Sequence, residues 1–247
     1  MPFGIEHSGY VLAPLREGAD FTLYRGQQHG NLSPVLVVAL AAEHPSLESL
    51  RRFEHEYSLA AELDPVWAAK PLALSRYEAR TILVLSDPGG EPLDRILERG
   101  RGQPLDLTRA LRIAIGLTAA LGQVHRHGLI HKDIKPDNVL VDEADSVWLT
   151  GFGIASRLPR ERQLPIPPEI ISGTLAYMAP EQTGHMNRSV DARSDFYSLG
   201  VTLYLMLTGA LPFDAADPWN GSTATLHAGR HRLGIALQCP SHCLRSL

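Results

Sequence analysis

The fold is decided by the stretch His131-Lys132-Asp133-Ile134-Lys135-Pro136-Asp137-Asn138, near the middle of a chain of 247 residues. Thirteen residues after its last member comes Gly151-Phe152-Gly153. Two further blocks follow, Gly173-Thr174-Leu175-Ala176-Tyr177-Met178-Ala179-Pro180-Glu181 and Asp195-Phe196-Tyr197-Ser198-Leu199-Gly200. One such block could arise by chance, whereas four blocks in this order and at this spacing indicate membership of one family.

Composition and charge exclude several classes of protein. Hydrophobic residues make up 44% of the chain and charged residues 20%, as in ordinary soluble globular domains. The formal net charge of -4 leaves no basic surplus to neutralise phosphates, so we expect no nucleic acid as partner. Cys239 and Cys243 provide no disulfide framework, which favours a reducing cytoplasm. The longest apolar stretches, at 35–42 and 201–207, are too short for a membrane span of roughly 20 residues, so we expect no membrane insertion.

The first third of the chain predicts strands and one helix. Residues 21–24 are rich in strand-forming types, and residues 35–40 and 81–85 are continuous apolar runs of the kind found in buried strands. Residues 46–63 carry apolar side chains at three- and four-residue steps behind a serine that can cap a helix. The turn sequence Asp-Pro-Gly-Gly at 87–90 then marks a lobe boundary.

The remainder of the chain predicts mainly helix. Residues 107–127 have a helical pattern, and Gly128 is suited to end that helix. Short strands are expected on both sides of the turn at 142–146. Residues 194–208 form a second apolar, helical segment that ends at Gly209.

The four blocks resemble the motifs of protein kinases. The first resembles the catalytic loop His-x-Asp-x-x-x-x-Asn, and Gly151-Phe152-Gly153 stands where the family has Asp-Phe-Gly. The pairs Lys135-Pro136 and Gly173-Thr174 match the Ser/Thr branch. The segment 151–158 is also similar to the N-terminal kinase-like domain of bacterial hybrid proteins that continue into an ATPase module and a sensor histidine kinase.

The resemblance covers residues 10–215 and implies a fold of the α+β class. We expect a bilobal protein-kinase-like domain, with a β-rich N-lobe at 1–88 and a helical C-lobe at 89–215 that is incomplete. Residues 216–247 form an atypical tail, such as a frameshift or an early stop would produce. The histidine and cysteine pairs of this tail have spacing that poorly fits a zinc site.

The resemblance implies an ATP-dependent phosphotransferase that acts on a protein and uses Mg²⁺. Asp133 would accept the proton of the substrate hydroxyl, and Lys135 would neutralise charge on the transferred phosphoryl group. Asn138 would ligate magnesium through its side-chain oxygen. The family's second metal ligand, an aspartate, is replaced by Gly151. We therefore expect metal binding to be degraded.

Three further residues would support the catalytic loop by resemblance. His131 is expected to pack and orient the loop rather than to transfer protons. Thr174 would form hydrogen bonds close to Asp133 and Lys135. Asp195 would accept hydrogen bonds from backbone N–H groups of the loop and hold its shape.

The N-terminal half departs from the family in two motifs. Of the three glycines expected in the phosphate-binding loop only Gly18 is present, since Arg16 and Phe21 occupy the other positions. This favours an ordinary β-hairpin. An alignment on Val-Ala-x-Lys puts Ala41 at the lysine position. Glu56, which matches the glutamate that pairs with that lysine, is then expected to be an ordinary surface glutamate.

The resemblance also implies a nucleotide pocket between the lobes. Pro88 falls in the linker that would contact the purine, and proline has no N–H to donate. We expect weak ATP binding. The residues that would line such a pocket are Leu15, Gly18, Leu23, Ala39, Leu85 and Asp87.

Three hypotheses about function remain open at this stage. The first is a signalling domain with a degraded ATP and magnesium site, a pseudokinase, that acts by binding a protein partner. The second is a weakly active protein serine/threonine kinase, supported by Asp133, Lys135 and Asn138. The third is a truncated fragment with no function of its own.

Overall fold

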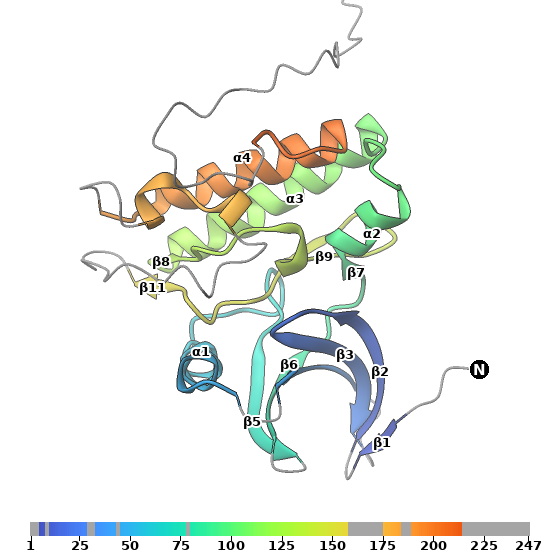
Figure 1. Cartoon of the computed structure of the whole chain (residues 1–247), viewed down its shortest axis with the longest axis vertical. Coiled ribbons are helices and arrows are strands. Elements are labelled where there is room, and N and C mark those ends of the chain that lie inside the picture. Colours follow the sequence, from blue (N-terminus) through green and yellow to red (C-terminus); the bar gives the residue numbers. More distant parts are fainter. Residues whose placement is uncertain are drawn as a thin grey trace, which may run out of the picture.

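The computed structural model describes residues 5–7, 10–28, 33–42, 45–77, 80–157, 175–183 and 189–213, and every structural statement here concerns these residues (Figure 1). Thr174 and the tail at 216–247, with its histidine and cysteine pairs, lie outside the described residues. The described chain forms two lobes. Figure 1 shows the curved sheet and α1 in one lobe and helices α2, α3 and α4 in the other.

The N-lobe is a six-stranded antiparallel sheet with the strand order β1-β2-β3-β4-β6-β5. One helix, α1 (Leu47–Ser58), packs beside β5 and β6. Ser46 caps this helix as predicted, because its hydroxyl accepts a hydrogen bond from the Ser49 N–H at 3.1 Å. The helix ends five residues earlier than the expected residue 63. The strands are β1 (Ile5–His7), β2 (Tyr10–Glu17), β3 (Phe21–Gln28), β4 (Pro34–Leu40), β5 (Pro71–Tyr77) and β6 (Arg80–Ser86).

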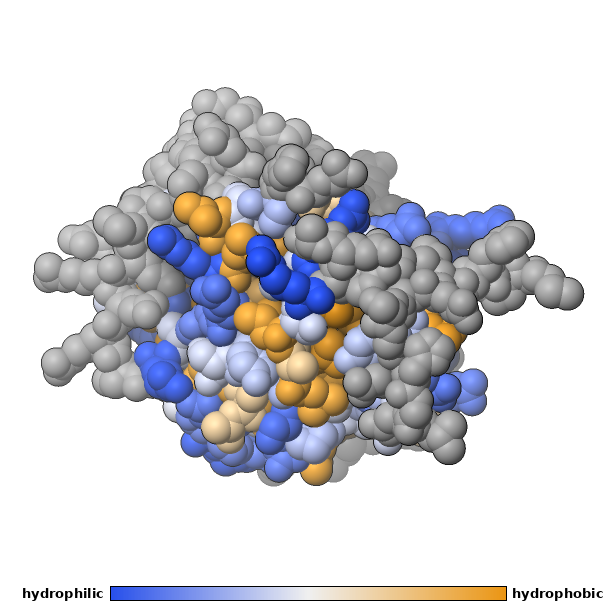
Figure 2. Space-filling view, turned by 90° about the horizontal axis from the view of Figure 1, so that it is seen from below, coloured by the Kyte–Doolittle hydropathy of each residue, from blue (hydrophilic) through white to orange (hydrophobic). Residues whose placement is uncertain are grey.

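The two faces of this sheet bury different side chains. The face toward α1 and the other lobe forms a cluster around Leu23, Leu36 and Leu85. The opposite face forms a second cluster around Val37 and Val84. Figure 2 views the molecule from the N-lobe side, where hydrophobic residues gather along the middle of the face between hydrophilic ones.

The C-lobe is built on two long helices, α3 (Leu107–Arg126) and α4 (Ala192–Thr208), which pack against each other. Both end as predicted, since Gly128 and Gly209 have φ of 72° and 73°, a conformation that favours glycine. The smaller elements are β7 (Glu91–Pro92), α2 (Leu93–Arg99), β8 (Leu129–Ile130), η1 (Pro136–Asn138), β9 (Val139–Val141), β10 (Val147–Leu149), β11 (Ser156–Arg157), η3 (Leu175–Tyr177) and η4 (Pro180–Thr183).

Helix α4 leaves one apolar side uncovered in the described structure. Phe196, Tyr204 and Leu207 are at least 39% exposed, although the helix buries Leu199 and Met206. No helix of the described residues is long and apolar enough to cross a membrane.

The same helix anchors the segment 131–138 through a single buried carboxylate. Asp195 is fully buried and accepts hydrogen bonds from the backbone N–H groups of His131, at 2.9 Å, and Lys132, at 2.7 Å. His125 of α3 contacts the same carboxylate at 2.8 Å. Lys132 has a φ of 68°, which is uncommon for a residue with a side chain. The predicted structural role of Asp195 is confirmed by these contacts.

Replacement of Asp195 by asparagine should therefore destabilise the whole domain. The asparagine NH₂ group would face a backbone N–H, and one buried donor would lose its acceptor. We expect a loss of about 3 kcal/mol in the free energy of unfolding, measured by denaturant titration. Asp191→Asn, at the exposed N-cap of α4, is the matched control and should cost no more than about 1 kcal/mol. Equal losses in the two variants would contradict the anchoring role.

Candidate functional site

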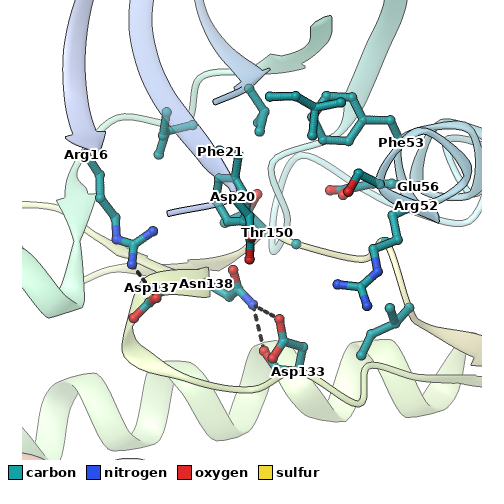
Figure 3. Close-up of a pocket in the computed structure, with 17 residues that line it drawn as sticks. Arg16, Asp20, Phe21, Arg52, Phe53, Glu56, Asp133, Asp137, Asn138 and Thr150 are labelled. Atoms are coloured by element: carbon teal, nitrogen blue, oxygen red, sulfur yellow. Dashed lines mark hydrogen bonds and ion pairs between the residues drawn. The ribbon is translucent and has the colours of Figure 1, made fainter. Parts of the chain in front are cut away.

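The segment 131–138 brings the three predicted catalytic side chains together. Lys135 Nζ lies 3.1 Å from Asp133 Oδ2. The Asn138 amide donates hydrogen bonds to the same carboxylate oxygen and to the Asp133 carbonyl, both at 2.8 Å (Figure 3). The other oxygen, Asp133 Oδ1, is buried and has no hydrogen-bond partner among the described residues. One carboxylate oxygen is therefore left without a donor from this part of the chain.

The His131 side chain connects this segment to Thr150 and Phe152. Its ring is fully buried, and Nε2 lies 3.0 Å from the Thr150 carbonyl. Because that carbonyl can only accept, Nε2 carries the proton and Nδ1 accepts from the Asp133 N–H. The ring packs on Phe152 with centroids 4.5 Å apart. Burial lowers the pKa of His131, which keeps the imidazole neutral. These contacts confirm a packing and orienting role.

A cleft of about 910 Å³, including solvent at its mouth, lies between the two lobes above Asp133. The β2–β3 hairpin, β4, α1 and the segment 131–138 contribute to its walls (Figure 3). Among the predicted site residues, Leu23, Asp133 and Asn138 line it. The complete lining is Arg16, Asp20, Phe21, Leu23, Val38, Leu40, Ser49, Arg52, Phe53, Glu56, Asp133, Asp137, Asn138, Thr150, Gly151, Gly153 and Ile154.

Gly151 leaves no room for a side chain at the predicted metal position. Its φ is 79°, and a Cβ placed there would lie 2.5 Å from Asn138 Oδ1. The Asn138 amide thus fills the space that an aspartate side chain at residue 151 would enter. Its hydrogen bonds to Asp133 hold it in that place.

The hairpin predicted for residues 15–24 is confirmed and closes over the cleft. Gly18 lies in its turn, where its N–H donates to the Phe21 carbonyl at 3.0 Å. Arg16 forms ion pairs with Asp94 of α2 and Asp137 of the segment 131–138. Burial raises the pKa of Asp137, and the Arg16 guanidinium opposes that shift. Arg16 therefore joins the N-lobe hairpin to the C-lobe, a contact that the sequence did not predict.

Strand β4 presents a different face to the cleft from the one expected. Val38 and Leu40 line the cleft. Ala39 packs on the opposite face of the sheet, and Ala41 lies exposed past the end of the strand. Alternate residues of a strand point to opposite faces, so residues 39 and 41 share the face that points away from the cleft. The assignment of Ala41 to the lysine position is therefore wrong. Ala39 is not brought to the cleft.

Glu56 is buried, which corrects the expectation of a surface glutamate. Its side chain lines the cleft from α1 and is 5% exposed (Figure 3). Oε1 has no hydrogen-bond partner in the described structure. Burial raises the pKa of Glu56 from its ordinary value of 4.5 to about 7, although hydrogen bonds from the backbone of Phe152 and Gly151 act in the opposite direction.

The remaining residues of the predicted nucleotide pocket are placed outside the cleft. Leu85 is fully buried in a cluster with Leu36 and Leu140, and Leu15 packs against that cluster. Asp87 is held by Arg25, whose Nη2 donates to Asp87 Oδ1 at 2.9 Å. Asp87 therefore ties β3 to the lobe linker and does not face the cleft.

Comparison with known proteins decides the family. The model of the family described as "Protein kinase domain" matches residues 39–235. The chain belongs to the protein kinase family. The family match continues past residue 215, where the motifs end. It starts after the β2–β3 hairpin, whose sequence departs from the glycine-rich pattern.

This protein kinase domain is similar to bacterial serine/threonine-protein kinases. It is 31% identical over 215 residues to "Serine/threonine-protein kinase pkn2" of Myxococcus xanthus, which covers 85% of this chain and 25% of that protein. It is 33% identical over 205 residues to "Serine/threonine-protein kinase PknL" of Mycobacterium bovis. The aligned region covers 82% of this chain and 50% of that protein. The chain thus spans a quarter to a half of the length of these two relatives.

The contact between Gly151 and Asn138 can be tested against a glycine with the same backbone conformation. Gly128 has a φ of 72°, and a Cβ added there meets nothing within 4 Å. Alanine at either position should cost about 1–2 kcal/mol for the left-handed backbone. Only Gly151→Ala should cost about 1–3 kcal/mol more, because it displaces the hydrogen-bonded Asn138 amide. Denaturant unfolding measures both values, and equal losses would contradict the contact.

The buried position of Glu56 predicts an unusual dependence of stability on pH. Between pH 4.5 and about 7 the folded state binds the Glu56 proton more tightly than the unfolded chain does. Stability should therefore fall as pH rises through that window, by about 3 kcal/mol in total. Glu56→Gln should remove this loss and be the more stable protein at pH 8, as measured by denaturant unfolding.

The control for this experiment is Glu54→Gln, which removes the same charge from an exposed position of the same helix. Its pH profile should follow that of the unmodified protein. A Glu56→Gln variant that is less stable than the unmodified protein at pH 8 would show that the carboxylate has a stabilising partner.

Proposed function

We propose that this chain is a protein-kinase-fold signalling domain of the Ser/Thr type that acts by binding and does not catalyse efficient phosphoryl transfer. The observation that carries the proposal is the pair Gly151 and Asn138. Magnesium in such sites needs carboxylate oxygens, and residue 151 offers none. The Asn138 amide occupies the nearby space and is bonded to Asp133. The residues present therefore do not fit the metal.

The basic residue for the phosphates is missing as well. Protein kinases place a lysine on the strand that corresponds to β4, where it pairs with a helix glutamate and reaches the phosphates. Here β4 presents Val38 and Leu40 to the cleft, and Glu56 Oε1 has no partner in the described structure. Asp20 and Asp133 add negative charge to the same walls, which disfavours a polyphosphate.

The expected purine side of the cleft offers little surface to a ligand. Leu36, Leu85 and Leu140 have no exposed area and pack in one cluster. A flat ligand would have to separate these side chains and expose apolar area at about 25 cal/mol per Å². We infer that ATP does not enter this space while the lobes are closed.

A weakly active serine/threonine kinase is the second candidate, and one observation favours it. Asp133 Oδ1 is free of partners in the described structure, while Lys135 lies 3.1 Å from Oδ2. The carboxylate could therefore accept a hydrogen bond from a Ser or Thr hydroxyl of a protein and orient its oxygen. Lys135 is close enough to neutralise negative charge beside that oxygen.

We propose a protein as the partner of the domain and the cytoplasm as its compartment. The relatives are named serine/threonine-protein kinases, which act on or with proteins. The absence of a cysteine framework in the sequence is typical of a reducing compartment.

Titration with ATP and a phosphate-transfer assay test the proposal together. Calorimetry should detect no micromolar affinity for ATP and no gain on addition of magnesium, because residue 151 supplies no carboxylate. Transfer of labelled phosphate to a generic basic protein should lie several decades below the usual rates of about 1–100 s⁻¹.

Asp133→Asn is the control for the transfer assay. Rapid turnover that disappears in Asp133→Asn would establish the second candidate and overturn the first. Residual counts that are equal in the two proteins would come from contamination and would leave the binding function in place.

A further inference from the structure

We propose that the cleft binds a small organic cation with a flat apolar body, such as an aryl amidinium or arylalkyl ammonium, through Glu56 and Asp133. This rests on the proposed function in one respect, namely that nucleotide does not occupy the cleft. It adds a class of ligand that differs in charge from ATP. The ligand would supply a positive charge where the chain itself has Val38 and Leu40.

Two unpaired carboxylate oxygens in the cleft require hydrogen-bond donors. Glu56 Oε1 and Asp133 Oδ1 are both buried without a partner from the residues that the structure describes, and both residues line the same cleft. Glu56 is 95% buried, so its carboxylate is reached only through the cleft (Figure 3). A buried acceptor without a donor costs about 1–3 kcal/mol, which a ligand N–H group would recover. Ammonium and amidinium groups carry donors and charge, and have no acceptor.

The charge of the cleft also selects a cation. Its lining has four acids, Asp20, Glu56, Asp133 and Asp137, and two arginines, Arg16 and Arg52. Arg16 is paired with Asp94 and Asp137, and Arg52 with Glu48 at 2.9 Å. The arginine charges are therefore directed to other acids. Asp133 is paired with Lys135 through Oδ2, while Glu56 has no ion pair with either arginine; in the described residues each of the two acids keeps one oxygen without a hydrogen-bond partner.

Apolar side chains line the cleft together with Glu56 and Asp133. Phe21 and Phe53 both line the cleft, and aromatic faces attract cations; the Arg16 guanidinium already lies 5.9 Å from the Phe21 ring. A metal ion fits less well, because no group of three or more His, Cys, Asp or Glu side chains in the described residues could hold one. The apolar members of the lining are Phe21, Leu23, Val38, Leu40 and Phe53.

The test uses the full chain and three probes of similar shape. Benzamidine is a flat cation, benzamide its neutral analogue and benzoate its anionic one. Calorimetry or ligand-observed NMR should show benzamidine binding at least tenfold more tightly than benzamide, and benzoate not binding. Equal affinities for benzamidine and benzamide, or no binding of benzamidine, would overturn the proposal.

Two pairs of variants test where in the cleft the cation binds. Glu56→Gln should reduce benzamidine affinity at least tenfold, while Glu54→Gln on the exposed side of α1 should not. Val38→Lys puts a cation inside the cleft and should also abolish binding, whereas Ala41→Lys adds the same charge outside it and should not. The second pair remains decisive if Glu56→Gln fails to fold. Unchanged affinity in folded Glu56→Gln and Val38→Lys would overturn the proposal.

The affinity should also depend on pH in a defined direction. Benzamidine must displace the Glu56 proton, whose pKa is about 7, so its affinity should rise about tenfold from pH 6 to pH 8. A flat profile would contradict binding at Glu56. Other charged groups also face the cleft. The pH dependence of benzamidine affinity in Glu56→Gln measures how much these groups contribute to the profile. They are Arg16, Asp20, Arg52, Asp133 and Asp137.

An ATP titration of the same samples separates this inference from the proposed function. Magnesium-dependent ATP binding would overturn the proposed function whatever benzamidine does. Absence of both ATP and benzamidine binding would overturn only the cation site.

Discussion

The hydrogen bonds from the His131 and Lys132 N–H groups to the Asp195 carboxylate are the contact on which the rest of the structure depends. They hold Lys132 at a φ of 68°, a conformation that would otherwise be unfavourable. The turn that results directs the His131 ring onto Phe152 and sets Asp133 below the cleft. This network serves the fold, so it can remain intact while residues that would serve a nucleotide change.

Three features of the cleft share one physical character, because each is a contact within the chain. Arg16, at a position where kinases have glycine, joins the hairpin to Asp94 and Asp137. Asn138 donates a hydrogen bond to Asp133. Leu36, Leu85 and Leu140 fill the expected purine side with apolar contacts. The lobes are thus held together by contacts within the chain.

Glu56 is the exception to this pattern, since it is buried and keeps one oxygen without a partner in the part of the chain that the structure describes. Burial of a carboxylate is unfavourable unless a charge or donors compensate for it. The helix α1 that carries it is otherwise amphipathic and packs Phe53 into the N-lobe core. A residue that costs stability in an otherwise well-packed lobe is more readily explained by a ligand than by the fold.

Local sequence predicted the parts of the fold that depend on local physics. The ends of α3 and α4 follow from Gly128 and Gly209, because only glycine adopts positive φ at little cost. The start of α1 follows from the Ser46 cap. Strand β5 and helix α2 were not predicted, and β5 owes its place to pairing with β6. Packing against distant elements decided them, and a local pattern does not contain that information.

The sequence by itself determined the family, the catalytic-loop residues and the loss of the metal carboxylate, because these are matters of residue identity and spacing. Only the tertiary structure decided which face of β4 meets the cleft and that Glu56 is buried there. A continuous apolar strand has no alternation to mark its inner face, and a shift of one residue exchanges the two faces. The surroundings of a glutamate likewise depend on groups that are distant in sequence, here the side chains of Val38 and Asp133 and the backbone of Phe152.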